Sequence, residues 1–283
     1  MAASLTGDRD MLLKLIDLER YPLDDMERGK GAEFLLECQK HMREQGWCNF
    51  DSFIRPDALE SLTAEANNLL PTAEALTIKR TIYQGDIDPS LPEDDPRRRE
   101  YIHRALQLAN DQIPAGSLIQ QLYRSELLTD FIRRVQGKAT LFRYADDFQA
   151  LNIVALQPGS WHAWHYDVNE CTVTLLLQAA EQGGEFTFIA NSRTKSEENR
   201  EVVDRFLSGD MTQAQSFPRG AGTLTLFRGG YSLHGVTEVG GNQPRVTAIL
   251  TYDEKPGCVA SDEINVRIYG PRVEKILAEK RSH

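Results

Sequence analysis

Three side chains in the second half of the chain have the types and spacing of a metal site. His165 and Asp167 lie two residues apart in WHAWHYD, just before the apolar run CTVTLLLQ. Because side chains alternate between the two faces of a strand, His165 and Asp167 would point to the same side. His234, in the apolar stretch YSLHGVTEV, can supply a second imidazole. Two histidines and one carboxylate on one face of a metal leave other coordination positions open, an arrangement suited to Fe(II) and O₂ chemistry.

A pair of anion-binding residues follows the last of these histidines. Arg245 and Thr247 lie on one face of the segment RVTAILTYDE, eleven residues beyond His234. A guanidinium can hold a carboxylate through two hydrogen bonds, and the threonine hydroxyl can add a third. A metal-bound keto acid with a second, distal carboxylate would need such a pair. A lone His-x-Asp is a weak signal, but the two histidines, the carboxylate and Arg-x-Thr together predict a metal-dependent active site.

The strands that must position these residues begin at residue 139. Turn signals such as PGS, EQGG and GGNQP separate several short segments rich in β-branched, aromatic and alternating apolar residues. There are eight of these segments: ATLFRYA, ALNIVALQ, WHAWHYD, CTVTLLLQ, EFTFIAN, TLTLFRG, YSLHGVTEV and RVTAILTYDE. Eight such strands predict a β-sandwich or barrel of the jelly-roll kind.

The pattern of apolar residues in the first half of the chain predicts helices. Apolar residues recur at helical spacing in segments 31–46, 56–71, 98–112 and 117–137. We therefore expect an α+β fold in a single catalytic domain, residues 1–283. In this domain, residues 1–137 form a mainly helical support, 138–256 form the strand core and 257–283 form a C-terminal extension.

A long polar insert, residues 191–220, interrupts the predicted strands. It joins the fifth strand to the sixth, and a short helix is expected around residues 196–208. A loop of this length is usually either a lid over a site or a surface excursion. The sequence leaves both interpretations open.

Composition excludes several classes of protein. The formal net charge of −10 repels phosphate backbones and disfavours a nucleic-acid substrate. The sequence contains no apolar stretch long enough to span a bilayer and no basic, then apolar, start typical of a signal peptide. The four cysteines lack paired spacing, which favours reduced thiols and a cytoplasmic protein. The sequence does not fix the oligomeric state, and a homodimer stays open.

The segments that carry these motifs resemble the 2-oxoglutarate/Fe(II)-dependent dioxygenases. GTLTLFRGGYSLHGVTEVGGNQPRVTAILTY looks like their C-terminal core, and WHAWHYD looks like their metal-binding strand. The resemblance covers about residues 139–254 and implies a double-stranded β-helix of eight strands. It also implies that His165, Asp167 and His234 bind Fe(II). Arg245 and Thr247 would bind the co-substrate 2-oxoglutarate, and O₂ would be the oxidant.

A branch of this superfamily that hydroxylates or halogenates free amino acids such as lysine is the most similar in pattern. The shared features are the WHxxH…D block, the GGEF hairpin and the helix-bearing insert. Halogenating members have a small residue in place of the carboxylate, so Asp167 implies hydroxylation. We therefore expect hydroxylation of an unactivated C–H bond in a small polar substrate, most simply a free amino acid. The alternatives are a prolyl-type peptide hydroxylase with an open groove and a cupin-like module that binds a metal without oxygen chemistry.

Five further residues are candidate contacts for the co-substrate or the substrate. Asn152 lies in the apolar segment ALNIVAL and could contact 2-oxoglutarate or a metal-bound water. His162 would face away from the metal on an ideal strand, but a bulge could return it to the cavity and the substrate. Trp164 is a third candidate, and Arg104 with Tyr269 could clamp a substrate carboxylate. For each residue, packing or a surface position is the alternative.

Overall fold

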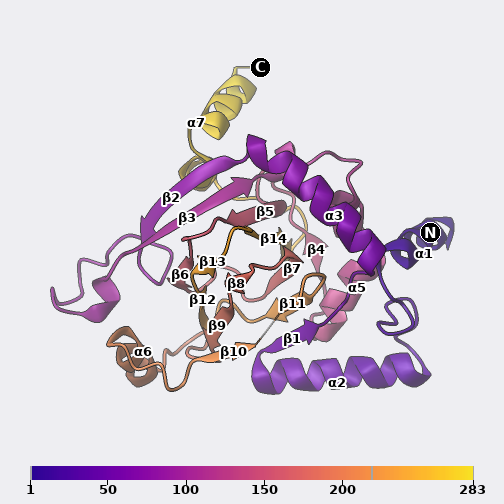
Figure 1. Ribbon diagram of the computed structural model, residues 1–283. Helices are drawn as coiled ribbons and strands as arrows, with labels where there is room; N and C mark the ends of the chain where they lie inside the picture. Colours follow the sequence, from indigo (N-terminus) through magenta and orange to yellow (C-terminus); the bar gives the residue numbers. More distant parts are fainter. Residues whose placement is uncertain (1, 218, 283) are drawn as a thin grey trace.

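The structure, a computed structural model, describes residues 2–217 and 219–282, with side chains from residue 6 onward. Two antiparallel β-sheets form its centre, and helices lie around them (Figure 1). Within the described residues the larger sheet has seven strands. In spatial order these are β1 (Trp47–Phe50), β11 (Leu224–Phe227), β7 (Thr172–Gln178), β14 (Arg245–Leu250), β5 (Leu151–Leu156), β3 (Tyr101–Leu108) and β2 (Glu74–Arg80).

The smaller sheet lies opposite the strands β5, β14 and β7. Its four strands within the described residues are β10 (Gln215–Phe217), β9 (Phe186–Ile189), β12 (Leu233–Val236) and β6 (His162–His165). Two short ribbons complete the strands: β13 (Val239–Gly240) with β8 (Gln182–Gly183), and β15 (Tyr252–Asp253) with β4 (Phe142–Arg143). The predicted α+β fold with a jelly-roll core is confirmed.

Strand alternation divides the apolar residues between two cores. On β5, Leu151, Ile153 and Ala155 face the helices, whereas Val154 and Leu156 face the space between the sheets. The whole strand is therefore buried, because both of its faces are covered. The inner face of the same sheet is where β14 carries its polar side chains.

The helices lie mainly on the outer face of the larger sheet. Their bounds are α1 (Ala2–Leu15), α2 (Gly29–Gln45), α3 (Pro56–Leu69), α4 (Leu118–Tyr123), α5 (Glu126–Val135), α6 (Arg200–Leu207) and α7 (Asp262–Arg281). The predicted helices at 31–46 and 56–71 are confirmed as α2 and α3. Gly46 ends α2 in a left-handed conformation with φ of 81° and donates to the carbonyl of Met42.

The segment 117–137 forms two helices instead of one. Ser125 lies between α4 and α5, and its side chain accepts a hydrogen bond from the backbone of Leu128. A serine that caps a new first turn starts a second helix and allows a change of direction. The apolar spacing alone did not reveal this break.

The prediction of a helix over 98–112 is wrong. Residues 101–108 form strand β3, which pairs with β2 and β5 and extends the larger sheet. Buried His103 and Ala105 alternate with exposed Ile102 and Arg104, as a sheet requires. Pairing on both sides overrides the helical propensity of Arg, Ala, Leu and Gln in this segment.

The predicted set of eight core strands also changes by one member. The segment ATLFRYA contributes only the two-residue strand β4, which pairs with β15 outside the core. The eighth core strand is β10, which lies near the end of the insert and pairs with β9. The insert is therefore partly integrated into the smaller sheet.

The helix of the insert, α6, packs against the outer face of β6. The ring of Trp164 contacts Phe206 edge-on at a centroid distance of 4.5 Å. The Tyr166 hydroxyl lies 2.9 Å from the Ser192 hydroxyl, and the Arg193 guanidinium lies over the Tyr166 ring at 3.9 Å. These contacts place α6 behind the strand that carries His165 and not over the cavity side. Among residues 2–217 and 219–282, no helix is both long and apolar enough to cross a bilayer.

The aromatic cluster under the helices yields a stability prediction. Phe131 on α5 is fully buried and contacts the rings of Phe34, Phe50 and Phe53. Phe131→Ala should lower the free energy of unfolding by about 3–5 kcal/mol, because it leaves a cavity in a packed core. Urea denaturation followed by circular dichroism measures this. Leu36→Ala on the exposed side of α2 is the control, with a change within about 0.5 kcal/mol; equal effects in both variants would contradict the packing.

Candidate metal centre

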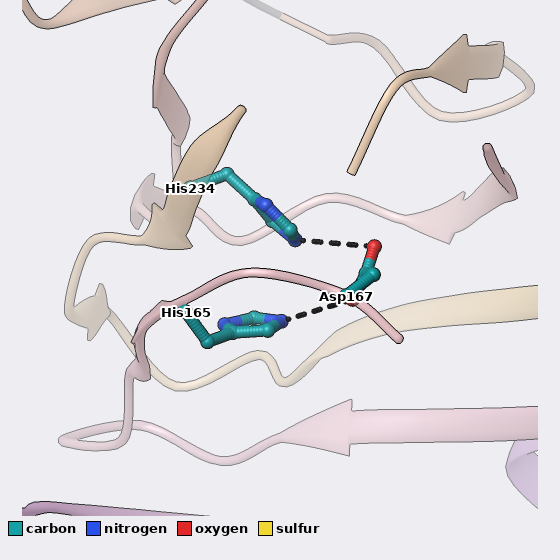
Figure 2. A group of neighbouring side chains, drawn as sticks. All are labelled: His165, Asp167 and His234. Carbon is teal, nitrogen blue, oxygen red and sulfur yellow. Dashed lines mark ion pairs between the residues drawn. The ribbon is translucent and has the colours of Figure 1, made fainter. Parts of the chain in front are cut away.

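His165, Asp167 and His234 meet between the two sheets. The antiparallel pairing of β6 and β12 places His165 directly opposite His234, and Asp167 follows two residues after the first histidine (Figure 2). The Nε2 atoms of His165 and His234 lie 3.3 Å and 3.5 Å from the two carboxylate oxygens of Asp167. Ligands about 2.1 Å from one ion in neighbouring octahedral positions would be about 3.0 Å apart. The three side chains therefore fit around one metal ion with little adjustment.

Backbone hydrogen bonds set the tautomer of both histidines. The Nδ1 of His165 lies 2.7 Å from the carbonyl oxygen of Ala163, and the Nδ1 of His234 lies 2.8 Å from that of Ser232. A carbonyl can only accept, so Nδ1 carries the proton in each ring and Nε2 presents its lone pair to Asp167 and the metal position. Burial lowers the pKa of His234 to about 4, against the opposing charge of Asp167, which keeps this imidazole neutral at physiological pH.

Asp167 is held in place by two hydrogen bonds. Its backbone amide donates to the carbonyl of Gly229 at 3.0 Å, and the Thr172 hydroxyl donates to its carboxylate. Burial acts to raise the pKa of Asp167, but His234, His165 and Thr172 outweigh it and hold the pKa well below the usual range. A Cβ on Gly229 would lie 2.0 Å from the carboxylate, so only glycine leaves room for it. The carboxylate is therefore ionised and fixed.

Arg245 and Thr247 line the same cavity as the three candidate ligands. Arg245 is only 5% exposed, and its Nε donates to the carbonyl of Gly184 at 2.9 Å while its Nη1 donates to the Thr247 hydroxyl at 2.6 Å. Burial lowers the pKa of Arg245 to about 10, so the guanidinium is still charged at neutral pH. No carboxylate of the described residues pairs with Arg245. A buried charge without a counter-ion points to an anionic ligand.

A second guanidinium lines this cavity and was missed by the sequence analysis. Arg219, just after β10, donates from Nη2 to the Thr174 hydroxyl at 3.0 Å and lies 5.7 Å from the centroid of the Phe186 ring. Its Nε is buried without a partner among the described residues. Burial and the nearby Arg245 lower the pKa of Arg219. Arg219 lies near the end of the polar insert, which shows no periodic pattern, so the sequence alone offers no signal for it.

The bulge suggested for His162 is present. His165 pairs with His234 but His162 pairs with Val236, so β6 has one more residue than β12 over this interval. His162 consequently lines the cavity and stacks on His165, with ring centroids 4.3 Å apart. His103 from β3 stacks on its other side at 4.0 Å. His162 therefore reaches the site as predicted geometrically, and its role in substrate binding stays a prediction.

The other predicted contacts lie away from the metal cavity. The amide oxygen of Asn152 accepts hydrogen bonds from Gln107 and from the Tyr269 hydroxyl, both at 2.6 Å, so these residues satisfy one another in the core. Arg104 is exposed on the opposite face of β3 from His103. Trp164 packs on α6 behind the metal strand. The structure does not bring these four residues to the metal, and we leave them out of the site proposed below.

Comparison with known protein families decides the identity of the chain. The model of the family described as Halogenase D matches residues 31–263, which include both halves of the fold and all three candidate ligands. The chain belongs to the Halogenase D family. A search of curated proteins found no significant match.

Solved structures confirm the fold of this Halogenase D family protein. It is similar to the α-ketoglutarate-dependent epimerase SnoN of nogalamycin biosynthesis, with 14% identity, a TM-score of 0.55 and coverage of 79% of this chain and 83% of that one. It is also similar to a 2OG-Fe(II) oxygenase family protein from Burkholderia pseudomallei, with 16% identity, a TM-score of 0.50 and coverage of 82% of this chain and 94% of that one. A third similar structure is HygX from Streptomyces hygroscopicus, solved with nickel and 2-oxoglutarate. The identity is 14%, the TM-score is 0.54, and the match covers 78% of this chain and 88% of that one. The family model, together with this fold, confirms the predicted membership of the 2-oxoglutarate/Fe(II)-dependent oxygenase superfamily, a superfamily of enzymes.

The close approach of Gly229 to Asp167 gives a test of the metal centre. Gly229→Ala should displace the carboxylate and weaken binding of Mn(II) or Fe(II) by about tenfold or more, because one ligand leaves its position. Anaerobic isothermal titration of the purified protein with each metal measures the affinity. Gly116→Ala is the control, since a Cβ there meets nothing within 4 Å. Unchanged metal affinity in Gly229→Ala would show that the Asp167 carboxylate is not a ligand.

Proposed function

We propose that this protein hydroxylates an unactivated C–H bond of a free amino acid, using Fe(II), 2-oxoglutarate and O₂. One observation carries the proposal. A complete His, Asp, His triad shares a cavity with two guanidiniums, Arg219 and Arg245, that have no carboxylate partner among the described residues. The triad suits Fe(II), and the guanidiniums suit the distal carboxylate of a keto acid.

The residues present fit the metal. Each histidine directs Nε2 at the same point because its Nδ1 proton is engaged, and Asp167 is ionised beside them. The ligand atoms of the triad all lie within 4.8 Å of one another. When bound together, Fe(II) and 2-oxoglutarate activate O₂ for oxidation of a C–H bond. The contribution of the protein is to orient these groups and to exclude water.

Arg245, Thr247 and Arg219 would hold 2-oxoglutarate. Arg245 and Thr247 already hydrogen-bond to each other, which fixes both donors on one side of the cavity. Gly184, in the GGEF turn, accepts from Arg245 and leaves space beside it, because a Cβ there would lie 3.1 Å from the arginine side chain. Phe186, Phe227 and Val154 form apolar walls that exclude water from the carboxylate contacts.

Asp167 favours hydroxylation over halogenation, despite the name of the family. A halide needs a coordination position on the metal, and in the halogenating pattern that position is freed by a small residue. Here a carboxylate, fixed by Thr172 and given room by Gly229, points at the metal position. Asp167 would therefore occupy the coordination position that a halide needs, which supports transfer of oxygen to the substrate.

Turnover of the purified protein tests the proposal. Wild-type enzyme with Fe(II), 2-oxoglutarate and O₂ should form succinate and add one oxygen to at least one compound of an amino-acid panel, detected by mass spectrometry. Asp167→Ala should lower product formation by at least about 100-fold, since a metal ligand is lost. Asp57→Ala, an exposed carboxylate on α3, is the control. Equal turnover in wild type and Asp167→Ala, or chlorination by the wild type in chloride buffer, would contradict hydroxylation at this centre.

The two guanidiniums give a separate prediction for 2-oxoglutarate. Arg245→Gln and Arg219→Gln should each weaken its binding by about tenfold or more, because a charged hydrogen bond to a buried carboxylate is worth about 1.5–3 kcal/mol. Anaerobic titration of the Mn(II)-loaded protein measures this affinity. Arg205→Gln is the control, because Arg205 forms an exposed ion pair with Asp210 on the same insert. Unchanged affinity in both cavity variants would place 2-oxoglutarate elsewhere.

A further inference from the structure

A second, larger cavity adjoins the metal centre. It has a volume of about 490 Å³ and shares Asp167, Thr172 and Ile249 with the cavity that contains the triad. Its other walls come from the end of β2, from the loop after β15 and from the first turns of α7. A molecule bound there would therefore touch Asp167, whereas Arg245 lines only the first of these two cavities. This placement suits the substrate, since the first cavity is assigned to 2-oxoglutarate.

The side chains that line this cavity carry more positive than negative charge. The guanidinium of Arg80, the last residue of β2, forms no ion pair or hydrogen bond with a described residue, whereas that of Arg267 on α7 is paired with exposed Asp86 at 2.9 Å. Burial, together with the charge of Arg267, lowers the pKa of Arg80 to about 10, with Asp167 opposing. Arg80 therefore presents a charged, unpaired guanidinium to whatever occupies the cavity.

No free carboxylate faces the cavity to receive a cation. Asp167 is the only acidic residue among its described lining residues, and it belongs to the metal centre. The nearby Asp146 is buried, and its two oxygens accept four hydrogen bonds, from the amides of Phe148, Gln149 and Ala260 and from the Asn265 side chain. Asp146 has no capacity left for a ligand.

One uncharged acceptor is free. Gln84 lines the cavity, and its side-chain oxygen is buried without a hydrogen-bond partner among the described residues. A buried acceptor of this kind normally has a donor, so a donor from the ligand would complete it. Arg80 and Gln84 lie four residues apart on either side of the turn after β2. Together they offer one site for an anion and one for a donor such as an ammonium group.

Part of the remaining wall is apolar and unusually exposed. Val168, Val259 and Ile264 are 90%, 60% and 47% exposed, and all three line this cavity. Ile249 and Ile268 continue the apolar surface toward the metal and α7. Exposed aliphatic groups gathered at one cavity indicate an apolar ligand part that covers them.

We propose that this cavity binds an α-amino acid with an uncharged, aliphatic side chain, and that it disfavours a cationic side chain such as that of lysine. The inference rests on the proposed function and names its substrate class. Arg80 takes the α-carboxylate, the Gln84 oxygen accepts from the α-ammonium group, and the valine and isoleucine side chains contact the aliphatic chain. A second ammonium group would enter this surface without a carboxylate to pair with, and an unpaired charge is costly to bury.

L-Norleucine and L-lysine are the decisive pair of ligands, because lysine is norleucine with one added side-chain ammonium group. Binding is measured by anaerobic titration of the protein loaded with Mn(II) and 2-oxoglutarate. Norleucine should bind at least about tenfold more tightly than lysine. Hexanoate, which keeps the carboxylate but lacks the α-ammonium group, should bind more weakly than norleucine. Lysine binding as tightly as norleucine would overturn the proposal.

Variants of Arg80 separate this inference from the proposed function. Arg80→Gln should weaken norleucine binding by about tenfold or more, and Arg80→Lys should recover part of it, because the charge is restored without the planar fork. Arg205→Gln is the control, since its guanidinium lies outside this cavity and is paired with Asp210. Both Arg80 variants should bind Mn(II) and 2-oxoglutarate as the wild type does, which also shows that they are folded. Unchanged norleucine binding in Arg80→Gln would overturn the inference alone, whereas absence of 2-oxoglutarate binding in the wild type would overturn the proposed function.

Discussion

The pairing of β12 with β6 is the constraint on which the metal centre depends. His165 lies opposite His234 in this pair, and the extra residue in β6 shifts the register before His162. As a result His162 and His165 both face the cavity, while Trp164 and Tyr166 face α6. A regular strand would place His162 on the outer face. The bulge therefore gives β6 a cavity side made of imidazoles and an outer side made of aromatic packing groups, and α6 stabilises it from behind.

Charge explains why the inner face of the larger sheet can be polar. Two guanidiniums and one carboxylate lie in a region that apolar residues otherwise enclose. Burying an unpaired guanidinium costs free energy, and Arg219 and Arg245 have only carbonyl and hydroxyl partners. An anionic ligand bound to both guanidiniums would offset this free-energy cost. A divalent metal beside Asp167 and a dicarboxylate beside the arginines would balance these charges.

Much of this site could be predicted from the sequence, because strand alternation is a local rule. The spacing of His165 and Asp167, and of Arg245 and Thr247, fixes which side chains share a face once the strands are known. Arg219 and Arg80 could not be predicted in this way. Arg219 depends on where a long insert ends, and Arg80 depends on β2 and β3 joining the larger sheet. Residues 98–112 have the composition of a helix, so the sheet extension that presents Arg80 was not expected.

The residues that the sequence predicted lie on the jelly-roll strands, and those that it missed lie mainly on the segments around them. The jelly roll carries the triad and the Arg-Thr pair, and these determine the type of chemistry. Arg80 and Gln84 near the end of β2, with Ile264 and Ile268 on α7, line the cavity that is proposed for the substrate. These segments lie outside the eight core strands but contact the metal strand β6, since the amide of Tyr166 donates to the carbonyl of Ile82 at 2.7 Å. Asp167 is the one candidate metal ligand that lines both cavities, and it would thereby link the position of the substrate to the position of the metal.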